Sequence, residues 1–440
     1  MVQSIYHLHP GANWMNDPNG PVFLNGQMHL FYQSNPFGAV WGNMTWGHAV
    51  SPDMVHWRRL GYALRPDMPY DAQGVFSGCC MVKDGLPHIL YTGVYPECVC
   101  LAVGDADGMN FVKHPENPVL RQGEANLLGW RDPFVWREGG EYRMALGAAR
   151  SGEGTWIELY RSGDLIHWER MADLARSAPG SPDEMWECPN VLFGDDGEAA
   201  IVVSAVPAFE TRVLSGTLKD GCFTERGLGA YDLGDCFYAP NTVIHPDGRA
   251  IQFGWMRERG DEDARAAQGW QGVMTLPREV RLEDGSVRVR PAKECAGLRD
   301  EALAVLSRRE LSAGETLDLA RGQFLELELY CDGASAFALD ALSDGHGRRV
   351  RMQFDGRGAV EIDFGALSGG KDRFVRARYR AEAELRLRLY VDGTALELYI
   401  NEREALSTRA YPDAACDALS LQALSGLRVR RLDVFRIHSA

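Results

Sequence analysis

Alternating apolar and polar residues dominate the last third of the chain. In RLRLYVDGTALELYI, residues 386–400, apolar side chains recur at every second position, and Asp392-Gly393 stands where the alternation pauses. A period of two is the pattern of a strand with one buried face, and Asp-Gly is typical of a tight hairpin turn. An antiparallel sheet with one buried face is therefore predicted. Its strands are predicted over residues 324–330, 386–391, 395–400 and 427–437.

The first two thirds of the chain carry shorter alternating runs and a recurring turn. Residues 51–57 and 162–168 both read S-x-D-[ML]-[VI]-H-W, and residues 104–111 are a weaker echo of them. Each echo follows a strand-like segment and precedes another turn. Small β units that cannot bury their apolar faces alone are typical of propeller blades. A β-sandwich with similar turns is the alternative.

The tryptophans divide the chain into two parts. All eleven lie between Trp14 and Trp270, which indicates that the residues beyond about 290 have a different role. Between the two parts, residues 291–311 carry apolar side chains at helical spacing, so we predict a short linking helix there. No other segment has a strong helical pattern. The chain is predicted to be all-β, with a first domain over 1–293, a linking segment over 294–310 and a second domain over 311–440.

Composition and charge exclude several classes of function. The net charge of -15 argues against nucleic acid, whose binding needs basic patches, and against anionic membrane surfaces. The negative net charge would not oppose the binding of a neutral sugar. The N-terminal residues lack the basic and apolar regions of a secretory signal. No segment approaches the roughly 18 apolar residues of a membrane span.

The cysteines predict a reducing compartment. Ten cysteines are present, and several lie in apolar, strand-like runs, as free thiols do when they act as small buried hydrophobes. We therefore expect a cytoplasmic protein. Cys98-x-Cys100 and His7-x-His9 have no matching Cys/His pair, so no metal site is predicted. The sequence carries no pattern that predicts an oligomeric state.

Three acids stand among Trp, Pro and Arg rather than among the charges of a solvated face. Asp17 lies in WMNDPNG, Asp132 in GWRDPFVW and Glu187 in WECP. Burial raises the pKa of an acid unless hydrogen bonds or a cation hold it ionised. Glycoside hydrolysis needs two carboxyls in different states, one ionised and one protonated. Taken singly, each motif is also typical of a turn or an ion pair; taken together, they indicate a carbohydrate-active site.

The neighbours of each acid predict its state. Asn16 and Asn19 can donate to Asp17 and favour its anion, and Arg131 should keep Asp132 ionised. Glu187 has no cation beside it in the sequence, which favours the protonated acid. The three acids are expected to come from different blades and to converge on one funnel.

The motifs WMNDPNG, RDP and EC, in this order, resemble the signature of glycoside hydrolase family 32, which includes invertases, sucrose-6-phosphate hydrolases, inulinases and levanases. The similarity continues through WGNMTWGHAVSPDMVHW, FSGCC and CFYAPNT, and LYVDGTALELYINEREALSTRAYP resembles the sandwich domain of the family. It therefore covers nearly the whole chain. The resemblance implies a five-bladed β-propeller followed by a C-terminal β-sandwich. It also implies a retaining β-fructofuranosidase that needs no cofactor.

The resemblance also implies residue roles. Asp17 matches the nucleophile, Glu187 the acid/base, and Asp132 the transition-state stabiliser that holds fructose hydroxyls. Further matches shape the fructose pocket in such enzymes: Asn16, Gln33, Trp41, Phe76, Ser77 and Arg131. Tyr238 resembles the Tyr of the D-F-Y-A motif. A double displacement with the two catalytic carboxyls roughly 5–5.5 Å apart is expected.

Two departures concern polar groups of the pocket wall, which set specificity. Thr45 stands where relatives often have His, and Cys236 stands where the motif would place Asp, with Asp235 beside it as a possible substitute. The expected substrates are sucrose, sucrose-6-phosphate or short fructo-oligosaccharides, and the sequence leaves the leaving group open. An inverting furanosidase of the arabinan-degrading kind and a non-catalytic sugar-binding propeller are the alternatives.

Overall fold

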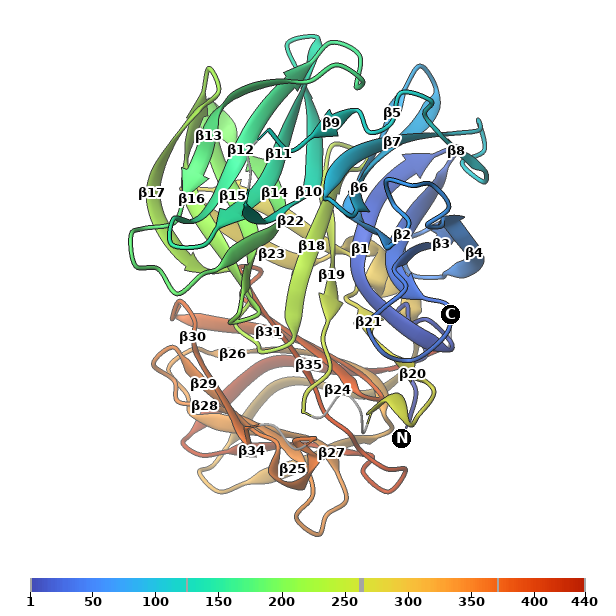
Figure 1. The fold of residues 1–440 in the computed structure, drawn as a ribbon. Coiled ribbons are helices and arrows are strands. Elements are labelled where there is room, and N and C mark those ends of the chain that lie inside the picture. The colour runs from blue at the N-terminus through green and yellow to red at the C-terminus, as the bar shows by residue number, and fades with distance from the viewer. Residues whose placement is uncertain (1, 124–125, 261–264, 370–371, 439–440) are drawn as a thin grey trace.

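Two groups of sheets make up the computed structural model, which describes residues 2–123, 126–260, 265–369 and 372–438 (Figure 1). Almost every described element is a strand, which confirms the prediction of an all-β chain. In the parts of the chain that the structure describes, three short 3-10 helices interrupt the strands: η1 (Asp195–Gly197), η2 (Lys293–Leu298) and η3 (Gly365–Leu367). No helix within the described ranges is long and apolar enough to cross a membrane.

Five sheets come from the first two thirds of the chain, and each is built on four antiparallel strands. The first contains β1 (Asn13–Leu24), β2 (Gln27–Asn35), β3 (Thr45–Ser51), β4 (Arg58–Leu64) and, parallel to β1, β20 (Trp270–Gln271). The second contains β5 (Gly74–Lys83), β6 (Leu86–Val94), β7 (Cys98–Gly104), β8 (Phe111–Lys113) and β9 (Leu120–Arg121). The third contains β10 (Leu127–Glu138), β11 (Glu141–Arg150), β12 (Gly154–Ser162) and β13 (Glu169–Arg176).

The remaining two sheets of this group follow the same plan. The fourth contains β14 (Met185–Phe193), β15 (Glu198–Val206), β16 (Glu210–Lys219) and β17 (Cys222–Ala230). The fifth contains β18 (Phe237–Ile244), β19 (Ala250–Met256), β21 (Val273–Met274), β22 (Arg278–Glu283) and β23 (Ser286–Pro291).

The first strands of these five sheets lie side by side around a common centre. β1 contacts β5 and β18, β10 contacts β5 and β14, and β14 contacts β18. In Figure 1, β4 and β17 lie toward the outside of the group. Side chains on the five first strands are therefore the ones that can meet at the centre.

The recurring turn has the same Asp hydrogen bond in its two full copies and a similar one in the weaker echo. Asp53, between β3 and β4, accepts from the backbone N–H of His56, and Asp164, between β12 and β13, accepts from that of His167. In the weaker echo, between β7 and β8, Asp105 accepts from a backbone N–H four residues later. The turn therefore joins the third and fourth strands in three of the five sheets, which makes these sheets copies of one unit.

Two six-stranded sheets form the rest of the chain. One has the order β24 (Arg299–Leu311), β35 (Leu427–Ile437), β26 (Phe324–Asp332), β31 (Glu384–Asp392), β32 (Ala395–Ile400) and β33 (Glu404–Arg409). The other has the order β25 (Thr316–Arg321), β34 (Ala418–Ala423), β27 (Phe337–Ser343), β28 (Val350–Phe354), β29 (Ala359–Asp363) and β30 (Phe374–Arg378). The four predicted strands and the turn between β31 and β32 are confirmed, because Asp392 pairs with Ala395.

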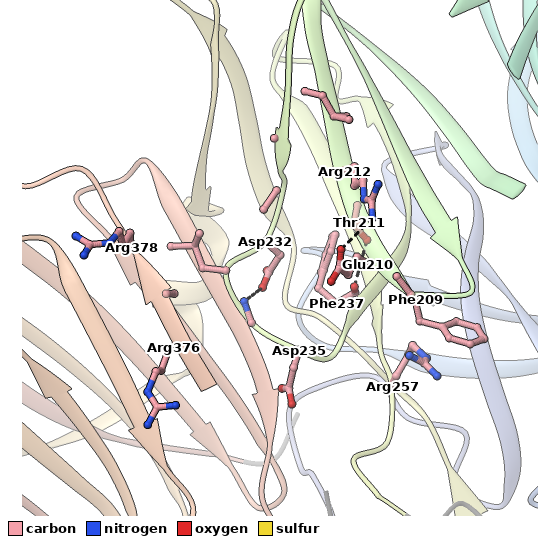
Figure 2. A pocket seen from close by; sticks show the side chains of 17 residues that line it. Phe209, Glu210, Thr211, Arg212, Asp232, Asp235, Phe237, Arg257, Arg376 and Arg378 are labelled. Carbon is pink, nitrogen blue, oxygen red and sulfur yellow. Dashed lines mark hydrogen bonds and ion pairs between the residues drawn. The ribbon is translucent and has the colours of Figure 1, made fainter. Parts of the chain in front are cut away.

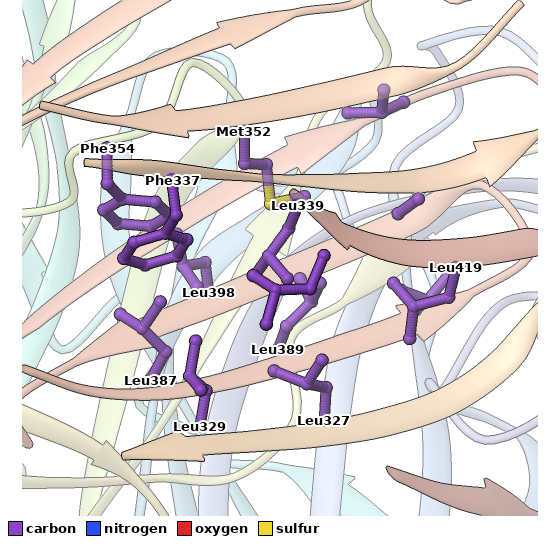
Figure 3. Packing of buried hydrophobic residues seen from close by; sticks show 14 of the residues in the cluster. Leu327, Leu329, Phe337, Leu339, Met352, Phe354, Leu387, Leu389, Leu398 and Leu419 are labelled. Atoms are coloured by element: carbon purple, nitrogen blue, oxygen red, sulfur yellow. The ribbon is translucent and has the colours of Figure 1, made fainter. Parts of the chain in front are cut away.

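Alternation along these strands produces one apolar core. Every second side chain of a strand points to the same face, so the leucines of RLRLYV are buried together. Side chains from both sheets meet in a single buried cluster (Figure 3). Its members include Leu327, Leu329, Leu387, Leu389, Leu398, Phe337, Leu339, Met352, Phe354 and Leu419.

The predicted linking helix is wrong. Residues 293–298 form the 3-10 helix η2, and the rest of the segment is the strand β24. β24 pairs with β35 from Arg299, opposite Ile437, to Leu311, opposite Leu427. Helix-favouring residues such as Ala, Leu, Glu and Arg give only a weak preference, and pairing with a long neighbouring strand overrides it.

A buried ionic network fastens the N-terminal segment and the fifth sheet to the C-terminal sheets. His7 contacts Asp392 at 2.8 Å and Glu397 at 3.0 Å, and Arg278 contacts Glu397 at 2.7 Å and Asp232 at 2.8 Å. Burial lowers the pKa of His7, but hydrogen bonds to the two carboxylates outweigh it and raise this pKa to about 9. The segment that leads into β1, and thus to Asp17, is therefore held in place.

Candidate active site

Each of the five first strands contains an irregularity at the same depth. One extra residue is inserted relative to the neighbouring strand within these spans: 15–18, 76–78, 131–134, 187–190 and 238–241. A bulge bends its strand and re-aims side chains, and it tolerates a residue without an N–H. Four of the five spans contain Pro: Pro18, Pro133, Pro189 and Pro240. In β5 the corresponding residue is Gly78.

The two residues before each Pro or Gly lie at or beside the centre. These pairs are Asn16-Asp17, Phe76-Ser77, Arg131-Asp132, Glu187-Cys188 and Tyr238-Ala239. Asp132, Cys188 and Ala239 have φ angles of 68°, 47° and 48°. A residue with a side chain seldom adopts this left-handed conformation, and such strain is typical of functional sites.

A cavity of about 540 Å³ lies where these strands meet. All ten residues singled out from the sequence line it: Asn16, Asp17, Gln33, Trp41, Phe76, Ser77, Arg131, Asp132, Glu187 and Tyr238. Trp41 is 59% exposed and its ring centroid lies 6.0 Å from that of Phe76, so these two rings form part of the rim. Gln33 is buried and donates from Nε2 to the carbonyl oxygen of Val75 at 3.1 Å.

Hydrogen bonds hold both oxygens of Asp17. Asn16 donates from Nδ2 to Oδ1 at 3.0 Å, and Ser77 donates from Oγ to Oδ2 at 2.7 Å. Asn19, which the sequence also suggested as a donor, instead accepts from the backbone N–H of Gly78. Burial raises the pKa of Asp17, the hydrogen bond from Ser77 opposes this, and the nearby charge of Glu187 adds to it.

Asp132 is buried beside Cys188. The backbone N–H of Cys188 donates to Oδ2 of Asp132 at 3.0 Å, and the Cys188 thiol lies 3.6 Å from the same oxygen and from Oδ2 of Asp17. Burial raises the pKa of Asp132 to about 7, against the opposing charge of Arg131. Arg131 favours the anion of Asp132, as expected from the sequence, but burial opposes ionisation and is the larger effect.

Glu187 lies between two donors. Arg131 donates from Nη2 to Oε1 at 2.8 Å, and Tyr238 donates from Oη to Oε2 at 2.6 Å. No cation is adjacent to Glu187 in the sequence, but the fold brings Arg131 to it from a different sheet, 56 residues away in the chain. Burial lowers the pKa of Arg131, but its pairing with Glu187 and Glu97 outweighs this and raises the pKa above its usual range. Burial and the charge of Glu187 raise the pKa of Tyr238.

The two departures lie away from the cavity. The Thr45 hydroxyl donates to the carbonyl oxygen of Asn43 at 3.0 Å, and the thiol of Cys236 lies 3.4 Å from Oδ1 of Asp235. Asp235 accepts from Arg259 at 2.7 Å, and neither residue 235 nor residue 236 lines the cavity. The suggestion that Asp235 substitutes for a pocket-wall Asp is therefore wrong, because that carboxylate is engaged elsewhere.

Sequence reasoning missed part of the wall. The cavity is also lined by Trp14, Met44, Tyr95, Glu97, Leu128, Phe209, Trp255 and Arg257. One signal was available for the first strands: a dipeptide followed by Pro occurs in four of the five sheets, in NDP, RDP, ECP and YAP. Glu97 and Arg257 lie outside that pattern, and only the fold brings them in. Within the described residues, no group of three or more His, Cys, Asp or Glu side chains is arranged to hold a metal ion.

Comparison with known proteins agrees with this geometry. The model described as "Glycosyl hydrolases family 32 N-terminal domain" matches residues 7–291, and "Glycosyl hydrolases family 32 C terminal" matches residues 295–438. A raffinose invertase of Escherichia coli is 33% identical, and a sucrose-6-phosphate hydrolase of the same organism is 32% identical; each match covers 96% of this chain and 92% of the relative. The crystal structure of fructan 1-exohydrolase IIa from Cichorium intybus has the same fold, with a TM-score of 0.90 at 22% identity over 100% of this chain and 98% of that one.

Proposed function

The chain belongs to glycosyl hydrolase family 32, and we propose that it is a retaining β-fructofuranosidase with Asp17 as nucleophile and Glu187 as acid/base. The observation that carries the proposal is the convergence of Asp17, Asp132 and Glu187 on one cavity from three different sheets. The names of the two bacterial relatives, an invertase and a sucrose-6-phosphate hydrolase, support a fructoside as the substrate.

We propose that the five N-terminal sheets are the blades of a β-propeller and that the two six-stranded sheets form a β-sandwich. The cyclic contacts of β1, β5, β10, β14 and β18 support the first, and the shared apolar cluster supports the second. The domains are then residues 1–293 and 311–440, joined by residues 294–310. The two matched family models, which meet between residues 291 and 295, support this division.

The first half of the reaction forms an ester on Asp17. One carboxylate oxygen of Asp17 attacks the anomeric carbon of fructose, and the bond to the leaving oxygen breaks as Glu187 transfers its proton to that oxygen. Ser77 and Asn16 orient both oxygens of Asp17, so its attack geometry is preorganised. Asp132, with a pKa of about 7, can accept from or donate to fructose hydroxyls.

The second half releases fructose. Glu187, now a carboxylate, removes a proton from water, whose oxygen attacks the anomeric carbon and frees Asp17. A tyrosine hydroxyl can donate or accept, whereas a guanidinium can only donate. Tyr238 can therefore stay bonded to Glu187 in both of its protonation states. Arg131 holds the other oxygen when that carboxyl is ionised.

The proposed substrates are sucrose, sucrose-6-phosphate and short fructo-oligosaccharides. An inverting arabinan-type furanosidase and a non-catalytic sugar-binding propeller are less well supported, because both family models match along nearly the whole chain. We also propose a cytoplasmic location, which the free state of the ten cysteines supports.

A substrate panel tests the proposal. Purified protein is given sucrose, sucrose-6-phosphate, 1-kestose and inulin in parallel, and released sugars are identified by chromatography. Fructose is expected from at least one of them. Asp17→Asn should abolish release while keeping the fold, checked by tryptophan fluorescence, because it removes the nucleophile and preserves the shape.

Three outcomes would contradict parts of the proposal. An Asp17→Asn protein that keeps a tenth of the wild-type rate would remove Asp17 from its role. Fructose released with inverted anomeric configuration, followed by NMR at early times, would refute double displacement. Tight sugar binding without any product would favour the non-catalytic alternative.

A further inference from the structure

Arg257 is a cation without a counter-ion in the wall of the catalytic cavity. It follows β19 directly and lines the cavity together with Tyr238. Among the described residues, no carboxylate lies within ion-pair distance of its guanidinium, and its Nε is buried without a hydrogen-bond partner. The other arginine of this cavity, Arg131, is by contrast paired with both Glu97 and Glu187.

Three aromatic rings hold this guanidinium in place. Its central carbon lies 3.9 Å from the ring centroid of Phe209, 5.6 Å from that of Trp255 and 5.7 Å from that of Tyr238. Ring faces attract a cation but offer no hydrogen-bond acceptor matching its N–H groups. The arrangement fixes the side chain and leaves donors available to a ligand.

The position of Arg257 is on the side of the leaving group. In the proposed mechanism, Glu187 protonates the leaving oxygen, so the leaving sugar lies next to Glu187. Tyr238, which is bonded to Glu187 at 2.6 Å, is one of the rings beneath Arg257. In the same mechanism the anomeric carbon of fructose lies next to Asp17, whose oxygens Asn16 and Ser77 hold.

A second cavity of about 670 Å³ shares Arg257 and Phe209 with the first as lining residues. Figure 2 shows these two side chains next to each other at one side of it, with Arg376 and Arg378 of β30 at the other. Space for a leaving group larger than a hexose therefore adjoins Arg257.

The carboxylates of the second cavity are already neutralised. Glu210 pairs with Arg212, Asp232 with Arg278, and Asp235 with Arg259. None of them compensates Arg257. In a chain of net charge -15, this leaves an uncompensated cation at the place where the leaving sugar is expected.

We propose that Arg257 binds a phosphate on the leaving sugar, so that the preferred substrate is a β-fructofuranoside whose leaving group is phosphorylated. This inference rests on the proposed fructosidase function and makes its substrate class specific. A guanidinium matches two phosphate oxygens with parallel N–H donors, and charge-assisted bonds of this kind are stronger than those to neutral hydroxyls.

The test compares kcat/KM for sucrose-6-phosphate and for sucrose in the full-length wild type and three variants. Wild type is expected to prefer the phosphorylated substrate by tenfold or more. Arg257→Gln should lower this preference by about tenfold or more, and Arg257→Lys, which keeps the charge but loses the paired donors, should lower it less. Arg378→Gln is the matched control on the far side of the second cavity, and it should change the preference less than twofold.

Several results would overturn the inference. The first is a preference unchanged within twofold in Arg257→Gln, and the second is a wild type that prefers sucrose. An equal effect of Arg378→Gln would also overturn it, because it would point to a diffuse positive field rather than a direct contact. Fructose released by the wild type from sucrose, 1-kestose or inulin in these cases leaves the proposed function standing, whereas no fructose from any of these or from sucrose-6-phosphate refutes both.

Discussion

Asp132 is expected to make the folded protein less stable as the pH rises. Burial raises its pKa from 3.8 to about 7 in the folded state. Between these two values the folded state keeps a proton that the unfolded state has released. Raising the pH through this window therefore favours unfolding, and the loss is complete above about pH 7. This is opposite to the usual behaviour of an Asp that is salt-bridged in the folded protein.

The size of the effect follows from the same two values. Each pH unit of difference corresponds to about 1.4 kcal/mol, so the change from 3.8 to about 7 corresponds to roughly 4 kcal/mol at most. Asp132→Asn removes the titration and keeps an oxygen for the backbone N–H of Cys188. Relative to wild type, the variant should gain about 2–4 kcal/mol between pH 4 and pH 8 while losing most of its activity.

Denaturant unfolding at pH 4.5, 6 and 8, followed by tryptophan fluorescence, measures this difference. Asp164→Asn is the control, because the pKa of Asp164 is shifted in the opposite direction. Partial burial opposes ionisation of Asp164, but hydrogen bonds from His167 and the backbone hold its pKa well below its usual range. That variant should be destabilised by a nearly constant amount at all three pH values, because Asp164 is ionised in both the folded and the unfolded state above pH 4.5 and its contribution is lost only below that pH. A difference between Asp132→Asn and wild type that stays constant from pH 4.5 to 8 would refute the reasoning.

Two further substitutions test the acid and the bulge of β5. Glu187→Gln should slow sucrose hydrolysis far more than hydrolysis of an aryl fructoside with a good leaving group, since the latter needs less protonation; equal losses in kcat for both substrates would contradict the acid role. Gly78→Ala should lower both activity and the unfolding midpoint, because its Cβ would lie 2.0 Å from the carbonyl oxygen of Leu90, beside Ser77. Gly227→Ala, at a position with open space, is the matched control, and an equal effect of the two substitutions would contradict this account.

The local sequence was enough to identify the three acids, but it did not predict which residues surround them in the fold. Asp17, Asp132 and Glu187 could be singled out because each stands beside Pro, Trp or Arg, and all ten predicted residues line one cavity. Their electrostatics depend on contacts between sheets. The bond from Arg131 to Glu187 joins residues 56 positions apart, and no feature of WECP indicates it.

The same limit explains the helix that the structure lacks. Residues 299–311 have helix-favouring side chains, and their partner strand β35 lies more than one hundred residues later. The residue pattern of a short segment indicates its own secondary-structure preference, but it does not reveal a strand far along the chain with which the segment pairs. The strands near residues 386–400 could be predicted because their partners follow at once, across a tight turn.

The repeated bulge connects the fold to the chemistry. Every first strand has a bulge at the same depth, before a Pro or a Gly. In each of the five strands this bulge directs two residues toward the common centre. The side chains that are delivered differ from sheet to sheet: Asn-Asp, Phe-Ser, Arg-Asp, Glu-Cys and Tyr-Ala. Nucleophile, acid and orienting groups can thus be exchanged without changing the pairing of any strand. Each motif is ordinary turn chemistry when taken alone, and it acquires a role because contacts among the five first strands bring it close to the others.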